Sequence, residues 1–156
     1  MTTREEAIAG ILEEHGTTAV YVASTGYVSR AVYALAGDKY SVFYMQGSMG
    51  LAPAIGLGIA MSSPADAVVI NGDGALLMSM GTTHTARELA LPNFFHYVLD
   101  NGCHESVGGQ RCARLDATYP GVTQVIRVDR GHKPPRVGVE AAENAMIVRS
   151  ALQEMR

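Results

Sequence analysis

Side chains that can hold a divalent cation stand in two glycine-rich turns of this 156-residue sequence. Asp73 lies between Gly72 and Gly74, and Asn101 precedes Gly102. Glycines around an acid let backbone N–H groups approach phosphate oxygens at the start of a helix. The carboxylate would repel that phosphate unless a cation lay between them, so we interpret Asp73 as a ligand of Mg²⁺ bridged to a diphosphate. The amide oxygen of Asn101 is a suitable second ligand, although each turn taken alone is also typical of a plain loop.

The two turns taken together resemble the thiamine diphosphate-binding motif of the thiamine diphosphate enzymes. Residues 75–100 separate them, which leaves room for the one helix and one strand that must lie between two neighbouring strand ends. The resemblance implies that Mg²⁺ is held by Asp73, Asn101 and the main-chain carbonyl of Cys103, with no part for the Cys103 thiol. Asp100 stands where the family commonly has a first asparagine, so only Asn101 of that pair matches.

Two further stretches are similar to the cofactor-binding segments of these enzymes. Residues 45–60 look like the segment that holds the aminopyrimidine ring. The resemblance implies that the Gly47 carbonyl binds the amino group of this ring and that Met49 bends the cofactor into its V shape; without the flanking motifs Met49 would be interpreted as a core residue. Residues 25–27 correspond to a loop that touches the diphosphate. The full set expected to contact the cofactor is Thr25, Gly26, Tyr27, Gly47, Ser48, Met49, Gly72, Asp73, Gly74, Ala75, Asn101, Cys103 and Ser106.

More narrowly, the chain resembles the phosphonopyruvate and sulfopyruvate decarboxylases. The similar stretches are residues 24–30, 47–50, 72–81 and 100–110. The phosphonopyruvate branch is favoured by one run of residues, in which His104 is followed by an acid and then by Ser106 to Gln110. Glu105 replaces the usual aspartate and residues 111–114 depart from the expected run, which leaves sulfopyruvate as the alternative substrate. The resemblance implies decarboxylation of a small anionic 2-oxo acid, with phosphonoacetaldehyde and CO₂ as the products from phosphonopyruvate.

His104 and Glu105 are the expected catalytic residues, because the resemblance places them beside the carbonyl ligand and near the reacting carbon of the cofactor. His104 can transfer a proton or serve as a structural imidazole, and Glu105 is alternatively a solvated or capping residue. Arginine suits a phosphonate, because it pairs with it through two parallel hydrogen bonds. The candidates, each weighed against a plain surface charge, are Arg30, Arg111 and Arg114, and Arg111 beside the Gly-Gly-Gln loop is the strongest of them.

These decarboxylases need two domains, one that binds the diphosphate and one that contributes a glutamate to the pyrimidine ring. The sequence matches only the first, and no acid in it corresponds to that glutamate. The resemblance therefore implies a small, beta-type subunit that is inactive alone and shares its cofactor with a separate pyrimidine-binding, alpha-type subunit. Two other classes stay open: a catalytically silent cofactor-binding or regulatory subunit, and an α/β nucleotide- or flavin-binding module with residues 72–74 as its phosphate turn.

Strands and helices alternate along the chain and would bring these turns to one edge of a sheet. Strands are predicted over 19–23, 41–45, 67–71, 94–99 and 123–128, and helices over 4–15, 29–35 with Ser29 as cap, 52–61, from the 72–74 turn through Leu89, and 140–155. The last helix is expected to turn five residues inward, namely Ala141, Ala145, Ile147, Val148 and Leu152. The alternation predicts an α/β fold, a three-layer sandwich with a mostly parallel sheet. Ligands bind beyond the carboxyl ends of such strands, where the glycine-rich turns fall.

Length and composition predict a single domain over residues 1–156. Apolar residues make up 47% and charged residues 17%, and the net charge is −3, which predicts binding to neither nucleic acid nor a membrane surface. The polar start of the chain and the short apolar part of residues 40–65 predict no signal peptide and no membrane span. The two cysteines, Cys103 and Cys112, are typical of a reducing compartment, so a cytoplasmic protein is expected.

Overall fold

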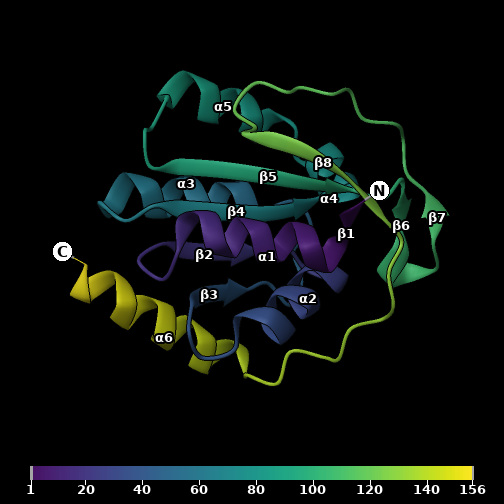
Figure 1. Ribbon diagram of the computed structural model, residues 1–156. Helices are drawn as coiled ribbons and strands as arrows, with labels where there is room; N and C mark the ends of the chain where they lie inside the picture. Colours follow the sequence, from purple (N-terminus) through teal and green to yellow (C-terminus); the bar gives the residue numbers. More distant parts are fainter. Residues whose placement is uncertain (1, 156) are drawn as a thin grey trace.

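Six parallel strands form the central sheet of the computed structural model, which describes residues 2–155 (Figure 1). They are β1 (Thr2–Thr3), β2 (Val20–Ala23), β3 (Ser41–Tyr44), β4 (Ala67–Gly72), β5 (Phe94–Asp100) and β8 (Gln124–Asp129), in the order β1-β8-β5-β4-β2-β3. A separate antiparallel ladder joins β6 (Cys103–His104) to β7 (Gln110–Arg111). The helices are α1 (Arg4–His15), α2 (Tyr27–Ala36), α3 (Ala52–Ser62), α4 (Asp73–Met78), α5 (Gly81–Leu89) and α6 (Ala141–Glu154), with a 3₁₀ turn η1 (Glu105–Val107). The predicted α/β fold is confirmed.

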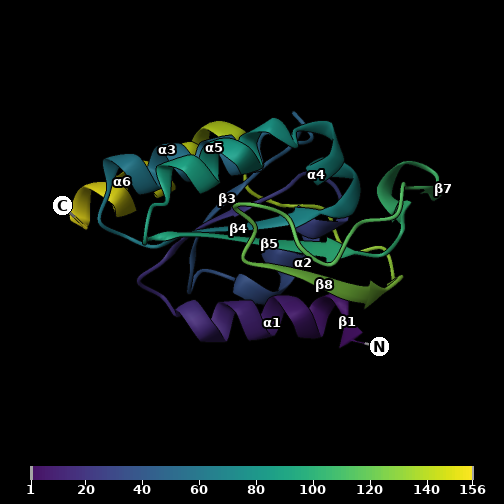
Figure 2. The same cartoon turned by 90° about the horizontal axis from the view of Figure 1, so that it is seen from above.

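Helices cover both faces of this sheet and so make the predicted three layers (Figure 2). α1 and α2 pack on one face, while α3, α5 and α6 lie on the other, together with the short α4. Along β2, Tyr21 and Ala23 join the core on the first face, and Val20 and Val22 join the core on the second. A strand buried on both sides carries apolar residues continuously rather than in alternation, which explains why β2 is a short unbroken apolar run in the sequence.

The order of the strands creates a crevice between the carboxyl ends of β2 and β4. From β2 the chain crosses through α2 to β3 at one edge of the sheet, and it then returns through α3 to β4 on the other side of β2. The connections that follow β2 and β4 therefore leave toward opposite faces of the sheet. In open α/β sheets this change of direction is where ligands bind. Thr25 and Asp73 both lie at this point of the structure.

Two helix predictions are corrected by the structure. The second helix begins at Tyr27 with Gly26 as its N-cap residue, so Ser29 is not the cap; it lies buried inside the helix. A positive φ of 88° at Gly26 lets the chain turn early enough to start the helix there. The stretch after Gly74 is two helices rather than one, because the backbone leaves the helical conformation at Ser79 (φ −140°, ψ 41°) before α5 begins.

The inward face of α6 was predicted only in part. Val148 is buried and Leu152 is partly buried, but Ile147 is 49% exposed, and Ala141 and Ala145 are exposed as well. The second buried residue of the helix is the polar Asn144, whose amide pairs with the free edge of β3. It accepts a hydrogen bond from the Tyr44 N–H (2.9 Å) and donates one to the Val42 carbonyl (2.7 Å). A buried backbone edge needs such partners, so a polar residue takes a position that an apolar pattern would leave exposed.

None of the helices in the described residues 2–155 is both long enough and apolar enough to cross a bilayer. The most apolar candidate from the sequence, α3, has 11 residues, whereas a span needs about 20. Four residues of α3 instead join or pack against the core on one face of the sheet, namely Ala52, Ile55, Ile59 and Ala60.

The C-terminal end of α5 offers a simple test of the backbone. Ala90 adopts the left-handed conformation there (φ 45°, ψ 43°), which glycine accepts without the steric cost of a Cβ atom. Ala90→Gly should therefore raise the free energy of unfolding by about 1 kcal/mol, measured by urea denaturation. Ala34→Gly in the exposed interior of α2 is the matched control and should lower stability by about 1 kcal/mol. Destabilisation by both changes would contradict the left-handed cap.

His96 makes the stability of the fold depend on pH. Its side chain is fully buried in β5, and burial lowers its pKa from the ordinary 6.5 to about 4. Between these values the unfolded chain binds a proton that the folded chain does not, so stability falls as the pH drops. We expect a loss of about 2 kcal/mol between about pH 7.5 and pH 5, measured by urea unfolding at each pH. His96→Gln should flatten this dependence, whereas replacing the exposed His84 in the same way should leave it unchanged.

Candidate active site

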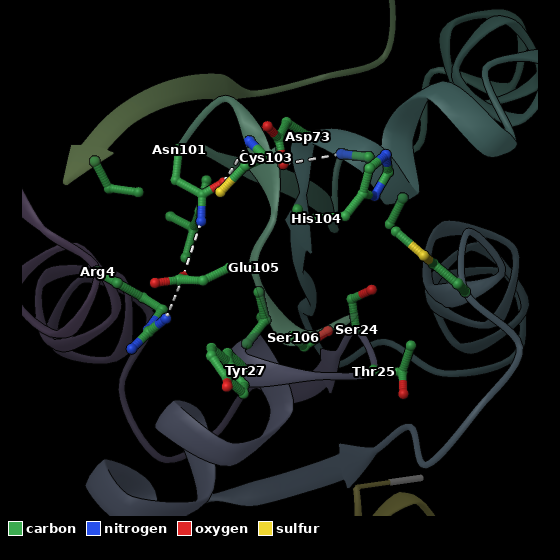
Figure 3. A pocket seen from close by; sticks show the side chains of 17 residues that line it. Arg4, Ser24, Thr25, Tyr27, Asp73, Asn101, Cys103, His104, Glu105 and Ser106 are labelled. Carbon is green, nitrogen blue, oxygen red and sulfur yellow. Dashed lines mark hydrogen bonds and ion pairs between the residues drawn. The ribbon is translucent and has the colours of Figure 1, made fainter. Parts of the chain in front are cut away.

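A small cavity opens at the carboxyl ends of β2, β4 and β5 and gathers most of the predicted site residues (Figure 3). Those that line it are Thr25, Tyr27, Met49, Gly72, Asp73, Gly74, Ala75, Asn101, Cys103, His104, Glu105 and Ser106. The other three, Gly26, Gly47 and Ser48, line an adjoining pocket that shares Thr25, Met49 and Ser106 with this cavity. The structure thus brings together all of the residues that were predicted to contact the cofactor, from four separate turns.

Asp73 presents an unsatisfied carboxylate oxygen in this cavity. It is the first residue of α4, only 4% exposed, and its Oδ1 atom accepts a hydrogen bond from the Gly74 N–H (2.9 Å). Its Oδ2 atom is buried without a hydrogen-bond partner. Burial raises the pKa of this carboxyl, and the neighbouring Asp100 adds to the effect. A buried charge of this kind is costly unless it is paired or coordinates a metal, so this oxygen fits a cation ligand.

Asn101 supplies a neutral oxygen in a fixed orientation. Its Nδ2 atom donates to Glu105 Oε2 (2.9 Å), and its Oδ1 atom accepts from the Cys103 N–H (3.0 Å). An amide oxygen has two lone pairs, so one remains for a cation. Within residues 2–155 no group of three or more histidine, cysteine, aspartate or glutamate side chains is placed to hold a metal. A cation here would therefore take its other ligands from Asn101, the main chain and a bound phosphate.

Glu105 lies at the centre of a buried network that the sequence did not predict. Its carboxylate, 14% exposed, pairs with Arg4 (3.0 Å) and accepts from the Gly131 N–H (3.1 Å), in addition to Asn101. Arg4 itself is 3% exposed and also donates to the His132 carbonyl (2.7 Å). The charge of Glu105 is thus satisfied by three partners, an arrangement that favours positioning of Asn101 over proton transfer. No local sequence pattern predicts this contact between Arg4 and Glu105, which are 101 positions apart.

His104 packs directly over Gly74 and faces the cavity (Figure 3). A Cβ atom at position 74 would lie 2.6 Å from His104 Nδ1, closer still to Cε1, and 3.1 Å from the Met49 methyl group. Position 74 therefore has room only for glycine. This close approach brings together His104, which is predicted to be catalytic, and Met49, which is predicted to contact the cofactor.

Burial disfavours the thiolate form of both cysteines. Cys103 and Cys112 are both buried and free. Burial raises the pKa of the Cys103 thiol, and burial together with the nearby Asp73 raises the pKa of Cys112 to about 11. A neutral thiol is a poor metal ligand and a poor nucleophile, which agrees with the expectation that Cys103 takes part through its main chain alone.

The family to which this geometry belongs is defined by its cofactor. The family described as "Thiamine pyrophosphate enzyme, C-terminal TPP binding domain" matches residues 21–151 of the chain. The chain therefore belongs to the thiamine pyrophosphate enzymes. The narrower resemblance to phosphonopyruvate and sulfopyruvate decarboxylases is also confirmed. Phosphonopyruvate decarboxylase of Streptomyces hygroscopicus is 42% identical over 120 residues, which cover 77% of this chain and 30% of that protein.

Two archaeal relatives carry the subunit name. Sulfopyruvate decarboxylase subunit beta of Methanothermobacter thermautotrophicus is 39% identical over 111 residues, 71% of this chain and 57% of that protein. The subunit beta of Methanococcus maripaludis is 33% identical over 137 residues, 88% of this chain and 70% of that protein. The chain thus spans about a third of the phosphonopyruvate decarboxylase and more than half of each beta subunit.

If Asn101 holds Mg²⁺ as the sequence predicts, its contact with Glu105 implies that Glu105 affects metal binding indirectly. Glu105→Ala removes the acceptor that orients the Asn101 amide, and groups that orient metal ligands are worth about 10- to 100-fold in metal affinity. We expect the Mg²⁺ concentration for half-maximal binding of thiamine diphosphate to rise by about 10-fold or more, measured by isothermal titration. The exposed Glu143 on α6 offers the matched control, Glu143→Ala, which should not change it. Equal Mg²⁺ dependence in the two variants would contradict the positioning role.

Proposed function

We propose that the chain is the diphosphate-binding part of a thiamine diphosphate- and Mg²⁺-dependent 2-oxo acid decarboxylase. The observation that carries this proposal is the buried, unpaired Oδ2 atom of Asp73, which lines one cavity with Asn101 and Cys103. The preferred substrate is phosphonopyruvate, which is converted to phosphonoacetaldehyde and CO₂. The 42% identity to a phosphonopyruvate decarboxylase over 77% of this chain supports this choice of substrate. Sulfopyruvate is the second candidate, supported by the 70% of a sulfopyruvate decarboxylase subunit beta that the chain covers.

Each part of the site has a role in this proposal. Asp73, Asn101 and the Cys103 carbonyl hold Mg²⁺ and, through it, the diphosphate. The main chain around the 72–74 turn and the side chains of Thr25, Tyr27 and Ser106 bind the phosphate oxygens, together with Gly26 and Ala75. Gly47, Ser48 and Met49 hold the pyrimidine ring. When bound, thiamine diphosphate supplies the electron sink that makes loss of CO₂ possible.

The ionisable residues of the cavity divide between two tasks. His104 faces the cavity with a partly exposed ring, and we assign to it the transfer of a proton at the reacting centre. Glu105, first expected to be catalytic as well, is better suited to hold Asn101 in place, because its three partners leave its carboxylate engaged. Arg4 pairs with that carboxylate and balances its charge.

A pyrimidine-binding, alpha-type subunit completes the site in this proposal and supplies the activating glutamate. The name "subunit beta" of the archaeal relatives supports a partner. So do three apolar side chains on segments next to the site, Leu51, Met78 and Val107, which are 48%, 63% and 69% exposed. The two free cysteines support the cytoplasm as the compartment.

The test is CO₂ and aldehyde release from phosphonopyruvate and from sulfopyruvate, with thiamine diphosphate, Mg²⁺ and the co-expressed partner. Turnover of one acid only would support the reaction and select the substrate. The chain without its partner should give no turnover, and robust activity from it alone would refute the division into two subunits. Binding of thiamine diphosphate without turnover of either acid would favour a silent subunit, whereas binding of FMN or NAD in its place would favour a nucleotide module.

A further inference from the structure

A second, larger pocket adjoins the metal cavity and has a different electrostatic character. Its volume is about 540 Å³, and it shares Thr25, Met49 and Ser106 with the cavity that contains Asp73. Thr25 and Ser106 lie on the side of that cavity away from Asp73 (Figure 3). Two arginines line the second pocket, Arg30 and Arg136, and no carboxylate does. Six of the residues expected to contact the cofactor also line it, so the pocket is a positively charged extension of the cofactor site.

Among residues 2–155, Arg30 has no partner for its charge. Its Nη1 atom is buried and makes no hydrogen bond, and no carboxylate of the described residues lies within ion-pair distance of it. The guanidinium stands 5.5 Å from the centre of the Tyr27 ring, which supports it from one side. The neighbouring hydroxyl of Ser29, which also lines the pocket, is likewise buried without a partner. Buried donors without acceptors are costly, and an anion in this pocket would satisfy them.

Arg136 is brought to the same pocket by a segment that is held in place. The connection between β8 and α6 passes along α2 (Figure 1), and Gly138 approaches the Tyr33 hydroxyl so closely that a Cβ atom would lie 2.8 Å from it. Gln46 Nε2 donates to the Val139 carbonyl (3.0 Å), which ties this segment to the loop after β3. The backbone that follows Arg136 is thus anchored at Gly138 and Val139, while the Arg136 side chain is exposed.

Other arginines near the site do not have these properties. Arg4 is already paired with Glu105. Arg111, the strongest candidate from the sequence, is exposed on β7 and lines neither cavity, and Arg114 is exposed beyond it. Arg30 therefore replaces Arg111 as the strongest candidate for the arginine that binds the phosphonate.

We propose that Arg30 and Arg136 bind the anionic tail of the substrate, a phosphonate or sulfonate, in this pocket. The inference rests on the proposed function, because it names the part of the site that recognises the substrate's second charge. Planar guanidinium groups pair with tetrahedral oxyanions through parallel hydrogen bonds. Two cations without a neighbouring acid favour a dianion, so a phosphonate should bind more tightly than a sulfonate of the same length.

Direct binding tests the pocket without turnover. Phosphonoacetate is titrated into the complex loaded with thiamine diphosphate and Mg²⁺, and its dissociation constant is measured by calorimetry. Arg30→Gln should weaken binding roughly 100-fold and Arg136→Gln roughly 10-fold. The matched control Arg111→Gln should leave it unchanged. The affinity for thiamine diphosphate should stay within about twofold in all three variants, because none of the three arginines is among the residues assigned to the cofactor.

The outcomes separate this inference from the proposed function. If Arg30→Gln leaves phosphonoacetate binding intact while the wild-type complex decarboxylates phosphonopyruvate, the function stands and the pocket assignment is wrong. If Arg30 controls phosphonoacetate binding but neither keto acid is decarboxylated, the pocket stands and the reaction is wrong. If Arg30→Gln dissociates the two subunits in sedimentation experiments, Arg30 pairs with an acid of the partner, and the inference is overturned.

Discussion

Replacing Asp73 with asparagine should lower the affinity for thiamine diphosphate in the presence of Mg²⁺ by about a thousandfold. The substitution keeps the size of the side chain and removes its charge, and a unit charge near a cation in a partly buried site is worth about 4 kcal/mol. The Oδ2 atom that carries this charge has no hydrogen-bond partner among the described residues. Calorimetric titration of the subunit complex, with and without Mg²⁺, measures the effect.

The stability of the protein without its cofactor should move the other way. Asp73 is a buried charge close to a second one, Asp100, so neutralising it removes an unfavourable term. The unfolding temperature of Asp73→Asn without Mg²⁺ should therefore equal or exceed that of the wild type. The exposed Asp38 provides the control, since Asp38→Asn should alter neither quantity. A variant that keeps its Mg²⁺-dependent affinity would refute the metal assignment.

The second large effect is expected at Gly74, where a single methyl group meets two site residues. In Gly74→Ala the new Cβ atom would collide with the His104 ring and press on the Met49 methyl group. Both must shift, and displacement of a catalytic group by about 1 Å can cost about 100-fold in rate. We expect a loss of about this size in kcat, measured in the complex with saturating thiamine diphosphate and Mg²⁺.

A second glycine provides the control for Gly74→Ala. Gly58 is exposed in α3, and a Cβ atom there meets nothing within 4 Å. Gly58→Ala should raise the free energy of unfolding by about 1 kcal/mol, because alanine is the better helix former, and should leave kcat unchanged. If Gly74→Ala also kept its kcat, the packing of His104 over Gly74 would have no part in the reaction.

The fold could be predicted from the sequence wherever a local apolar run specifies a strand buried on both faces. β2 and β4 are such runs, and the turns that follow them must meet at one edge of a parallel sheet. The position of Asp73 beside Thr25 follows from that rule. Helix boundaries are less predictable, since a serine at position 29 is typical of a cap, whereas the positive φ of Gly26 starts the helix earlier.

What escaped prediction depends on contacts between distant parts of the chain. The pair Arg4–Glu105 joins the first helix to the turn after β6, and no periodicity in either segment reveals it. Arg136 lies in an irregular segment, and it lines the same pocket as Arg30 because this segment passes α2. The apolar residues of α6 likewise gave no sign that Asn144 faces the sheet. Pairings of this kind require the tertiary structure.

The contact of Asn144 with β3 has a consequence for the order of events during synthesis. The amide that closes this edge is made 100 residues after the Tyr44 N–H that it pairs with. At about 5 to 20 residues per second, the ribosome takes on the order of 5 to 20 seconds to cover that distance. Throughout this interval β3 is an open strand edge, able to accept a strand of another nascent chain. The newly made protein is therefore most prone to aggregate before its last helix emerges, and docking of that helix ends the risk.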